Sequence, residues 1–128
     1  MIDKKYVELY DIAAQVMENA YAPYSNFKVG AALLTEDGEI FTGVNVENAS
    51  YGATVCAERS AVSNAVTAGK QNFEAMAIAS SEGEPWPCGI CRQVLLEFNG
   101  DMKVISGRNR DQLEIYILKD LLVKGFKL

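Results

Sequence analysis

The chain has 128 residues, of which 49% are hydrophobic and 23% charged, with a formal net charge of −5. This length is typical of one domain, here expected to span residues 1–128, and the composition excludes an intrinsically disordered protein. The acidic balance disfavours nucleic acid as a partner, and no apolar run approaches the length that crosses a bilayer, so no membrane partner is expected either.

Hydrophobic periodicity and turn residues predict the elements in chain order. Apolar residues at helical spacing indicate a helix over residues 6–20, and an Asp-Gly turn joins a hairpin of residues 27–34 and 40–46. The remaining expected elements are a loop (45–54), a helix (56–68) ending at Gly69, a strand (73–80), a helix (88–98) and two short strands (102–105 and 112–115). Residues 116–122 fit either a strand or a helix. Gly30, inside the first strand, marks a bulge or a close approach of another backbone.

This element order predicts an α/β fold with a mixed sheet and helices on its faces. The hairpin is antiparallel, whereas strand-helix-strand units imply parallel crossovers. Right-handed crossovers on one face place the starts of helices 56–68 and 88–98 side by side.

The cysteines and the lack of histidine narrow the chemistry. The chain has three cysteines and no histidine, which excludes Ser-His and Cys-His catalysis and any His-ligated metal. The N-terminal residues lack the apolar core of a signal peptide, so we expect a cytoplasmic protein. An odd number of cysteines in a reducing compartment is typical of reactive or metal-bound thiols.

The three cysteines form a candidate zinc site. Cys88 and Cys91 occupy positions i and i+3 of one helix, and Cys56 begins the other. Helix N-termini are expected to lower the pKa of each thiol. Three ligands without a fourth leave a position for water, which is typical of catalytic zinc. Glu58 lies in the same helical turn as Cys56 and is expected to take a proton from that water and return it to a substrate.

Two other interpretations of Cys-x-x-Cys are a thiol-redox pair and half of a structural zinc knuckle. Both leave Glu58 without a role, and the second does not explain the missing fourth ligand. Cys-x-Glu followed by Pro-Cys-x-x-Cys corresponds instead to the zinc-deaminase signature, in an all-cysteine form.

Over nearly its whole length the chain resembles the small, homotetrameric cytidine deaminases. The resemblance rests on four blocks in order: residues 24–33 (YSNFKVGAAL), 42–52 (TGVNVENASYG), 56–59 (CAER) and 87–93 (PCGICRQ). It implies a cytidine deaminase-like three-layer α-β-α sandwich with a five-stranded mixed sheet, one Zn²⁺ per chain and a homotetramer. The implied activity is hydrolytic deamination of cytidine and 2′-deoxycytidine to uridine and 2′-deoxyuridine plus ammonia, in pyrimidine salvage.

The resemblance also implies roles for individual residues. At the metal site, Cys56, Cys88 and Cys91 would bind zinc, Glu58 would shuttle protons, and Arg59 would lie against the cysteine sulfurs. Around the substrate, Phe27 would stack near the pyrimidine, the backbone of Ala57 would contact the base, and Asn45 and Glu47 would form hydrogen bonds with the ribose 3′-hydroxyl. Tyr51 and Phe126 would also contact the substrate. From the residues alone, Phe27 also fits the core, Asn45 and Glu47 fit a solvated loop, and Arg59 fits the surface. However, three thiolates and Zn²⁺ sum to −1, and a guanidinium beside them would restore acidity to the metal.

The chain departs from the family pattern at three positions. Val123 replaces the family's proline in the tail that carries Phe126, and Trp86 and Ile90 are unexpected beside the cysteines. Related zinc deaminases act on blasticidin S, guanine, dCMP or nucleic-acid bases. Phe27, Asn45 and Glu47 favour a free nucleoside, and the acidic charge disfavours a polynucleotide.

Overall fold

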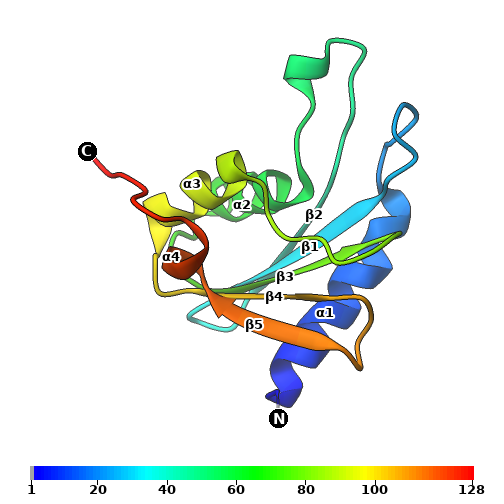
Figure 1. Ribbon diagram of the computed structural model, residues 1–128. Coiled ribbons are helices and arrows are strands. Elements are labelled where there is room, and N and C mark those ends of the chain that lie inside the picture. Colours follow the sequence, from blue (N-terminus) through cyan, green and yellow to red (C-terminus); the bar gives the residue numbers. More distant parts are fainter. Residues whose placement is uncertain (1) are drawn as a thin grey trace.

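The computed structural model describes residues 2–128 as a five-stranded mixed sheet with helices on both faces (Figure 1). The helices are α1 (Lys4–Val16), α2 (Ala57–Thr67), α3 (Gly89–Phe98) and α4 (Leu118–Leu121), with 3-10 turns η1 (Met17–Asn19) and η2 (Tyr51–Ala53). The strands are β1 (Val29–Thr35), β2 (Ile40–Val44), β3 (Phe73–Ser80), β4 (Lys103–Gly107) and β5 (Leu113–Ile117). They lie in the order β2-β1-β3-β4-β5, and β3 and β4 form the parallel pair. The predicted fold class is therefore confirmed.

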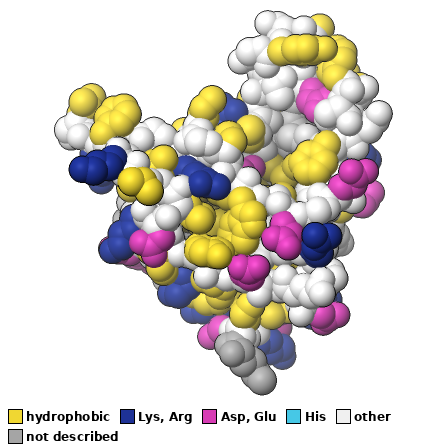
Figure 2. Space-filling model, in the orientation of Figure 1, with side chains coloured by type: hydrophobic (Ala, Val, Ile, Leu, Met, Phe, Trp, Pro, Cys, Tyr) yellow, Lys and Arg dark blue, Asp and Glu magenta, His cyan; other side chains and the backbone are white. Residues whose placement is uncertain are grey.

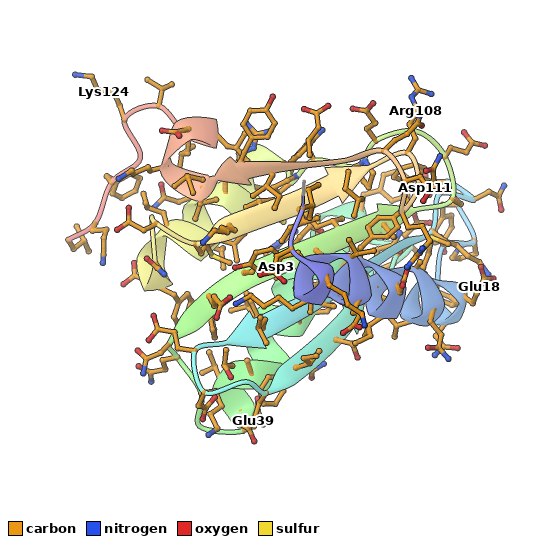
Figure 3. All side chains as sticks on the ribbon, turned by 90° about the horizontal axis from the view of Figure 1, so that it is seen from below. Asp3, Glu18, Glu39, Arg108, Asp111 and Lys124 are labelled. Carbon is orange, nitrogen blue, oxygen red and sulfur yellow. The ribbon has the colours of Figure 1, made fainter. Side chains whose placement is uncertain are left out.

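Two hydrophobic clusters lie on opposite faces of the sheet. Successive side chains of a strand point to opposite faces, so Ala31 and Leu33 of β1 belong to one cluster and Ala32 to the other. The first cluster includes apolar residues of α2, α3 and α4, and the second includes those of α1. Asp3 caps α1 by accepting a hydrogen bond from the backbone of Lys5 (Figure 3).

Two glycines allow these helices to lie directly on the sheet. A Cβ on Gly30 would stand 2.1 Å from the carbonyl oxygen of Ala13 in α1. This confirms the predicted close approach at Gly30, whereas the irregularity of β1 falls later, between Leu34 and Thr35. A Cβ on Gly43 would stand 2.3 Å from the backbone nitrogen of Ala61 in α2.

The structure corrects several predicted element ends. The second hairpin strand stops at Val44, and Val46 forms only isolated bridges, to Tyr21 and to Val55. β4 and β5 each continue two residues beyond their predicted ends, and α4 follows β5 directly, so the ambiguous tail contains both a strand end and a helix. Residues 45–54 form a loop that contains η2 and projects from the body of the molecule (Figure 1). Within residues 2–128, no helix combines the length and apolar character needed to cross a membrane.

Candidate metal centre and substrate pocket

The starts of α2 and α3 bring the three cysteines together, as predicted. Cys56 is the N-cap of α2, Cys88 is the N-cap of α3, and Cys91 lies in the first turn of α3. The three sulfurs lie within 4.8 Å of one another, and the Sγ atoms of Cys56 and Cys88 are 4.0 Å apart.

This cluster fits a zinc ion. Tetrahedral coordination with Zn–S bonds of about 2.3 Å separates two sulfurs by about 3.8 Å, close to the spacing between Cys56 and Cys88. Within residues 2–128 the cluster contains three cysteines and no carboxylate, and the chain has no histidine to add. Three sulfur ligands with one position left for water are typical of a catalytic zinc site.

Hydrogen bonds within the cluster distribute its charge unequally. A hydrogen bond from Cys91 and the adjacent Arg59 guanidinium lower the pKa of Cys56 to about 5. The pKa of Cys91 is raised instead, because its thiol donates a hydrogen bond to Cys56 and its side chain is buried. The prediction that every thiol has a lowered pKa was therefore wrong for Cys91, where these two effects exceed the effect of the helix N-terminus.

Arg59, in the first turn of α2, lies against this cluster. Its Nη2 donates to the Sγ of Cys56 at 3.3 Å, and the sulfurs raise the pKa of the guanidinium. Its Nε is buried without a hydrogen-bond partner among residues 2–128. A positive charge held this close offsets part of the negative charge of the thiolates.

Glu58 lies between the cluster and a pocket. Its side chain is only 5% exposed, and burial raises its pKa to about 7. A carboxyl group with this pKa exists in both protonation states near neutral pH, so it can accept and donate a proton.

The pocket beside Glu58 has a volume of about 380 Å³. Six of the predicted site residues line it: Phe27, Asn45, Cys56, Ala57, Glu58 and Cys88. Trp86 is among the other lining residues. Hydrophobic side chains flank a hollow between the projecting loop and the body (Figure 2). A largely apolar cavity of this size with a few polar groups is typical of small-molecule sites.

The wall formed by residues 84–86 was not assigned from the sequence. Each of its residues is held by a partner on β4 or β5 or in the turn between them. Glu84 forms an ion pair with Arg108 at 3.4 Å, and the carbonyl of Pro85 accepts a hydrogen bond from the buried hydroxyl of Ser106 at 2.6 Å. The ring of Trp86 packs edge-on against that of Tyr116, with 5.1 Å between the ring centroids. Arg108 stands just beyond the end of β4 (Figure 3). Trp86 was noted in the sequence as unusual, but its partners are distant in sequence, and no local pattern indicates them.

Asn45 supports the pocket through its buried side chain. Its Oδ1 accepts from the backbone of Val29 at 2.9 Å, and its Nδ2 donates to the carbonyl of Phe27 at 2.8 Å. Asn45 therefore fixes the backbone on both sides of Lys28.

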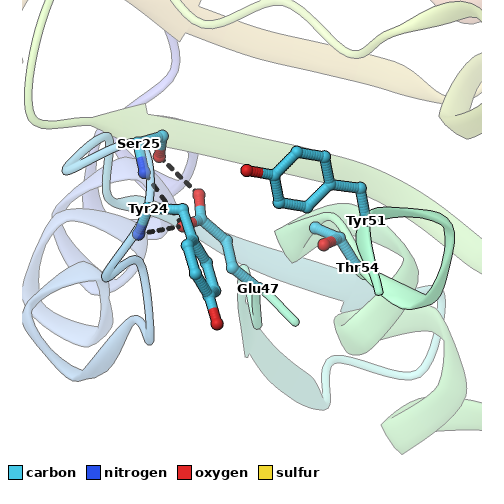
Figure 4. A pocket seen from close by; sticks show the side chains of 5 residues that line it. All are labelled: Tyr24, Ser25, Glu47, Tyr51 and Thr54. Atoms are coloured by element: carbon cyan, nitrogen blue, oxygen red, sulfur yellow. Dashed lines mark hydrogen bonds between the residues drawn. The ribbon is translucent and has the colours of Figure 1, made fainter. Parts of the chain in front are cut away.

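Glu47 and Tyr51 line a second pocket of about 410 Å³, which adjoins the first at Thr54 (Figure 4). Glu47 accepts hydrogen bonds from the backbones of Tyr24 and Ser25 at 3.0 and 3.1 Å and from the Ser25 hydroxyl. The serine hydroxyl, followed by the backbone donors, holds the pKa of Glu47 below its usual value. Tyr51 is 75% exposed and packs edge-on against Tyr24.

Phe126 is outside both pockets of its own chain. It is 66% exposed, and Gln93 of α3 bonds its backbone nitrogen and oxygen. The tail runs away from the body beside α3 and α4 (Figure 1). Ile90, on the first turn of α3, is also exposed.

Comparisons with known proteins agree with this geometry. The family model described as "Cytidine and deoxycytidylate deaminase zinc-binding region" matches residues 3–108. A cytidine deaminase from Sporosarcina psychrophila is 49% identical over 111 residues, covering 85% of this chain and 82% of that protein. A cytidine deaminase from Mycobacterium tuberculosis is 44% identical over 117 residues, covering 91% and 85%.

Solved structures give the same result. The crystal structure of cytidine deaminase from Burkholderia pseudomallei is 43% identical, with a TM-score of 0.89, covering 98% of this chain and 100% of that one. That of Mycobacterium tuberculosis is 39% identical, with a TM-score of 0.83 and coverage of 98% and 100%. Together with the match of the zinc-binding family model over most of the sequence, these similarities show that this chain belongs to the cytidine and deoxycytidylate deaminase family.

Proposed function

We propose that this protein catalyses the zinc-dependent hydrolytic deamination of cytidine and 2′-deoxycytidine. The observation that carries the proposal is buried Glu58 beside a three-sulfur cluster, at the wall of a pocket of about 380 Å³. Relatives that are 44% to 49% identical are named cytidine deaminases, which supports the same reaction here.

The three cysteines would hold one Zn²⁺, which when bound acts as a Lewis acid that lets water attack at neutral pH. Glu58 would accept the proton released by the attacking water and donate it to N3 of the cytosine ring, which makes C4 more electrophilic. It would then move the proton of the new C4 hydroxyl group to the amino group, so that the C4–N bond breaks, ammonia leaves and C4 becomes the carbonyl of the uracil ring. The pKa of about 7 suits both directions of transfer. Arg59 would limit the negative charge on the sulfurs.

We assign the positioning of the nucleoside to the residues around the two pockets. Phe27 and the backbone of Ala57 would contact the base, and Asn45 and Glu47 would contact the ribose 3′-hydroxyl. Tyr51 would contact the nucleoside from the solvent-exposed side of the second pocket. The side-chain amide of Asn45 can still bind the sugar, because after its two internal hydrogen bonds Oδ1 keeps one lone pair and Nδ2 keeps one N–H. The carboxylate of Glu47 likewise has acceptor sites left.

The charges around the pockets favour a nucleoside over a nucleotide. Among the described residues that line the two pockets are the carboxyl groups of Glu47, Glu58 and Glu84 but no lysine or arginine, and Arg108 beside the wall is already paired with Glu84. A 5′-phosphate would enter this region without an unpaired lysine or arginine in the lining to neutralise it, which is unfavourable. The alternative substrate dCMP is therefore disfavoured. The charge argument does not apply to blasticidin S, which has no phosphate, so the assay below compares it directly with cytidine.

The decisive experiment follows the loss of absorbance of the cytosine chromophore. The zinc-loaded protein should deaminate cytidine and deoxycytidine, with much lower kcat/KM for dCMP and blasticidin S. Glu58→Gln should lose about a hundredfold to ten-thousandfold in kcat, the range that general acid–base catalysis contributes, while keeping its zinc. The exposed Glu97→Gln on α3 is the matched control and should keep full activity. Unchanged turnover in Glu58→Gln would exclude the proton-shuttle role.

We also propose a homotetramer in the cytoplasm. Tyr51, Ile90 and Phe126 are 75%, 62% and 66% exposed, more than large apolar side chains usually are, and contact between copies would cover them. In such an assembly Phe126 would contact the substrate of a neighbouring subunit, and Phe126→Ala should raise KM. Light scattering should give four times the chain mass of 14.0 kDa, and a monomeric mass would contradict the assembly. The reduced cysteines that the site requires suit a reducing compartment, which cell fractionation can test.

A further inference from the structure

Arg92 joins two carbonyl groups that lie far apart in the sequence. Its Nε donates to the carbonyl of Pro87 at 2.6 Å, and its Nη1 donates to the carbonyl of Leu121 at 2.6 Å. Pro87 directly precedes the ligand Cys88, and Leu121 is the last residue of α4. The guanidinium therefore connects the loop that carries a metal ligand to the C-terminal helix, which lies beside α3 (Figure 1).

This arrangement depends on the shape of the arginine side chain. A guanidinium presents several N–H donors in a rigid plane, so one side chain can hold two carbonyl groups in fixed directions. A lysine ammonium is a single flexible point of charge and does not reproduce this geometry. Arg92 is half-buried, which strengthens hydrogen bonds from a charged group.

The Pro87 carbonyl belongs to the peptide that ends at the nitrogen of Cys88. Its direction therefore fixes the plane from which the Cys88 side chain departs. Residues 84–86 are held from β4, β5 and the turn between them, as described above, whereas the Pro87 carbonyl is held from α3 and, through the same guanidinium, from α4. The sulfur of Cys88, which follows this peptide, lies 4.0 Å from the sulfur of Cys56.

We infer that Arg92 is a positioning residue that holds Cys88 in ligating geometry and couples retention of zinc to the docking of α4. The inference rests on the proposed zinc site. Residues that orient a metal ligand without binding the metal themselves typically contribute about 10- to 100-fold to metal affinity. Arg92 acts on the ligand through the backbone and does not contact the pocket.

The neighbouring residue provides a matched control. Gln93 also reaches the C-terminal segment, where it bonds the backbone of Phe126, but it makes no bond to Pro87. If Arg92 acted only by fastening the C-terminal segment, Gln93→Leu would have the same effect on zinc as Arg92→Met. If it acts on Cys88, only the Arg92 variants should release zinc faster.

The experiment loads each full-length variant with zinc and follows transfer to the chromophoric chelator 4-(2-pyridylazo)resorcinol, well below the unfolding temperature. Arg92→Met should release zinc about tenfold faster than wild type, Arg92→Lys should be intermediate, and Gln93→Leu should match wild type. Circular dichroism of the zinc-free proteins shows whether each variant is folded. If Arg92→Met does not fold, Arg92→Lys decides, because it retains the charge and the apolar stem.

Release from a folded Arg92→Met, or failing that from Arg92→Lys, at the wild-type rate would overturn the inference. Equal acceleration in Gln93→Leu would also overturn it, because the effect would then belong to the C-terminal segment in general. A wild-type chain that binds no zinc would overturn the proposed function and this inference together, whereas a zinc-loaded wild type with unaffected variants overturns the inference alone.

Discussion

Gly43→Ala tests whether the packing of α2 on the sheet positions the active site. Gly43 lies in β2 beneath the first turns of α2. An added Cβ would stand 2.3 Å from the nitrogen of Ala61 and 2.5 Å from the carbonyl oxygen of Ala57. Both are backbone atoms, so no side-chain rotation relieves the contact.

The size of the effect follows from these distances. Ordinary van der Waals separations are about 3.5 Å, so α2 must move away from β2 by about 1 Å. Overpacking of this kind costs about 1–3 kcal/mol of unfolding free energy. Ala57 lies between Cys56 and Glu58, so the same displacement moves a zinc ligand and the proposed proton shuttle. A misplacement of about 1 Å can reduce catalysis about a hundredfold.

Urea unfolding and the deamination assay measure the two effects separately. We expect a lower urea midpoint for Gly43→Ala and a loss in kcat larger than the change in KM, with zinc supplied in excess. Gly89→Ala is the control, because a Cβ there has no atom within 4 Å and alanine favours the helix. If Gly43→Ala matched wild type in both measurements, α2 would not depend on this contact and the reasoning would be wrong.

Three further predictions follow from the same structure. Removing zinc with a chelator should lower the thermal midpoint by several degrees, because zinc binds the folded chain, and added zinc should restore it; an unchanged midpoint would contradict this. Tyr6→Phe should lose about 1 kcal/mol at pH 7, since it removes a 2.8 Å hydrogen bond to Glu74. Lys5 and Tyr6 hold the pKa of Glu74 below its usual value. The stability that this hydrogen bond contributes is therefore present above the pKa of Glu74 in the unfolded chain and is lost as the pH falls through its lower pKa in the folded chain. Urea unfolding should accordingly show a smaller difference in stability between wild type and Tyr6→Phe at pH 3 than at pH 7. Asn45→Ala should lose about 2 kcal/mol of stability with its two backbone hydrogen bonds and should weaken cytidine binding more than binding of free cytosine, and equal losses for the two ligands would separate Asn45 from the sugar.

The sequence was most informative where local patterns determine structure. The Asp-Gly turn between two apolar segments predicted the hairpin, and the buried strand was predicted with its observed bounds, Phe73–Ser80. Cysteines at two helix starts were sufficient to predict the metal cluster, because the chirality of the crossovers leaves few ways to arrange those helices. The short terminal elements were predicted less well, since each is only four or five residues long and packing decides its ends.

Details that depend on contacts between distant segments were not predictable. The wall of residues 84–86 depends on Ser106, Arg108 and Tyr116, and none of these is part of a motif. The raised pKa of Cys91 likewise depends on its burial and on the proximity of Cys56, which spacing within α3 does not reveal. The internal bonds of Asn45 show that a residue assigned to substrate can also support the fold.

The two halves of the metal centre are positioned by different parts of the chain. Cys56 and Glu58 move with α2, whose position is set by its close approach to β2 at Gly43. Cys88 and Cys91 move with the start of α3, which Arg92 ties to α4. The distance between the two sets of sulfurs therefore depends on both attachments at once, and a small shift of either helix start changes coordination and proton transfer together.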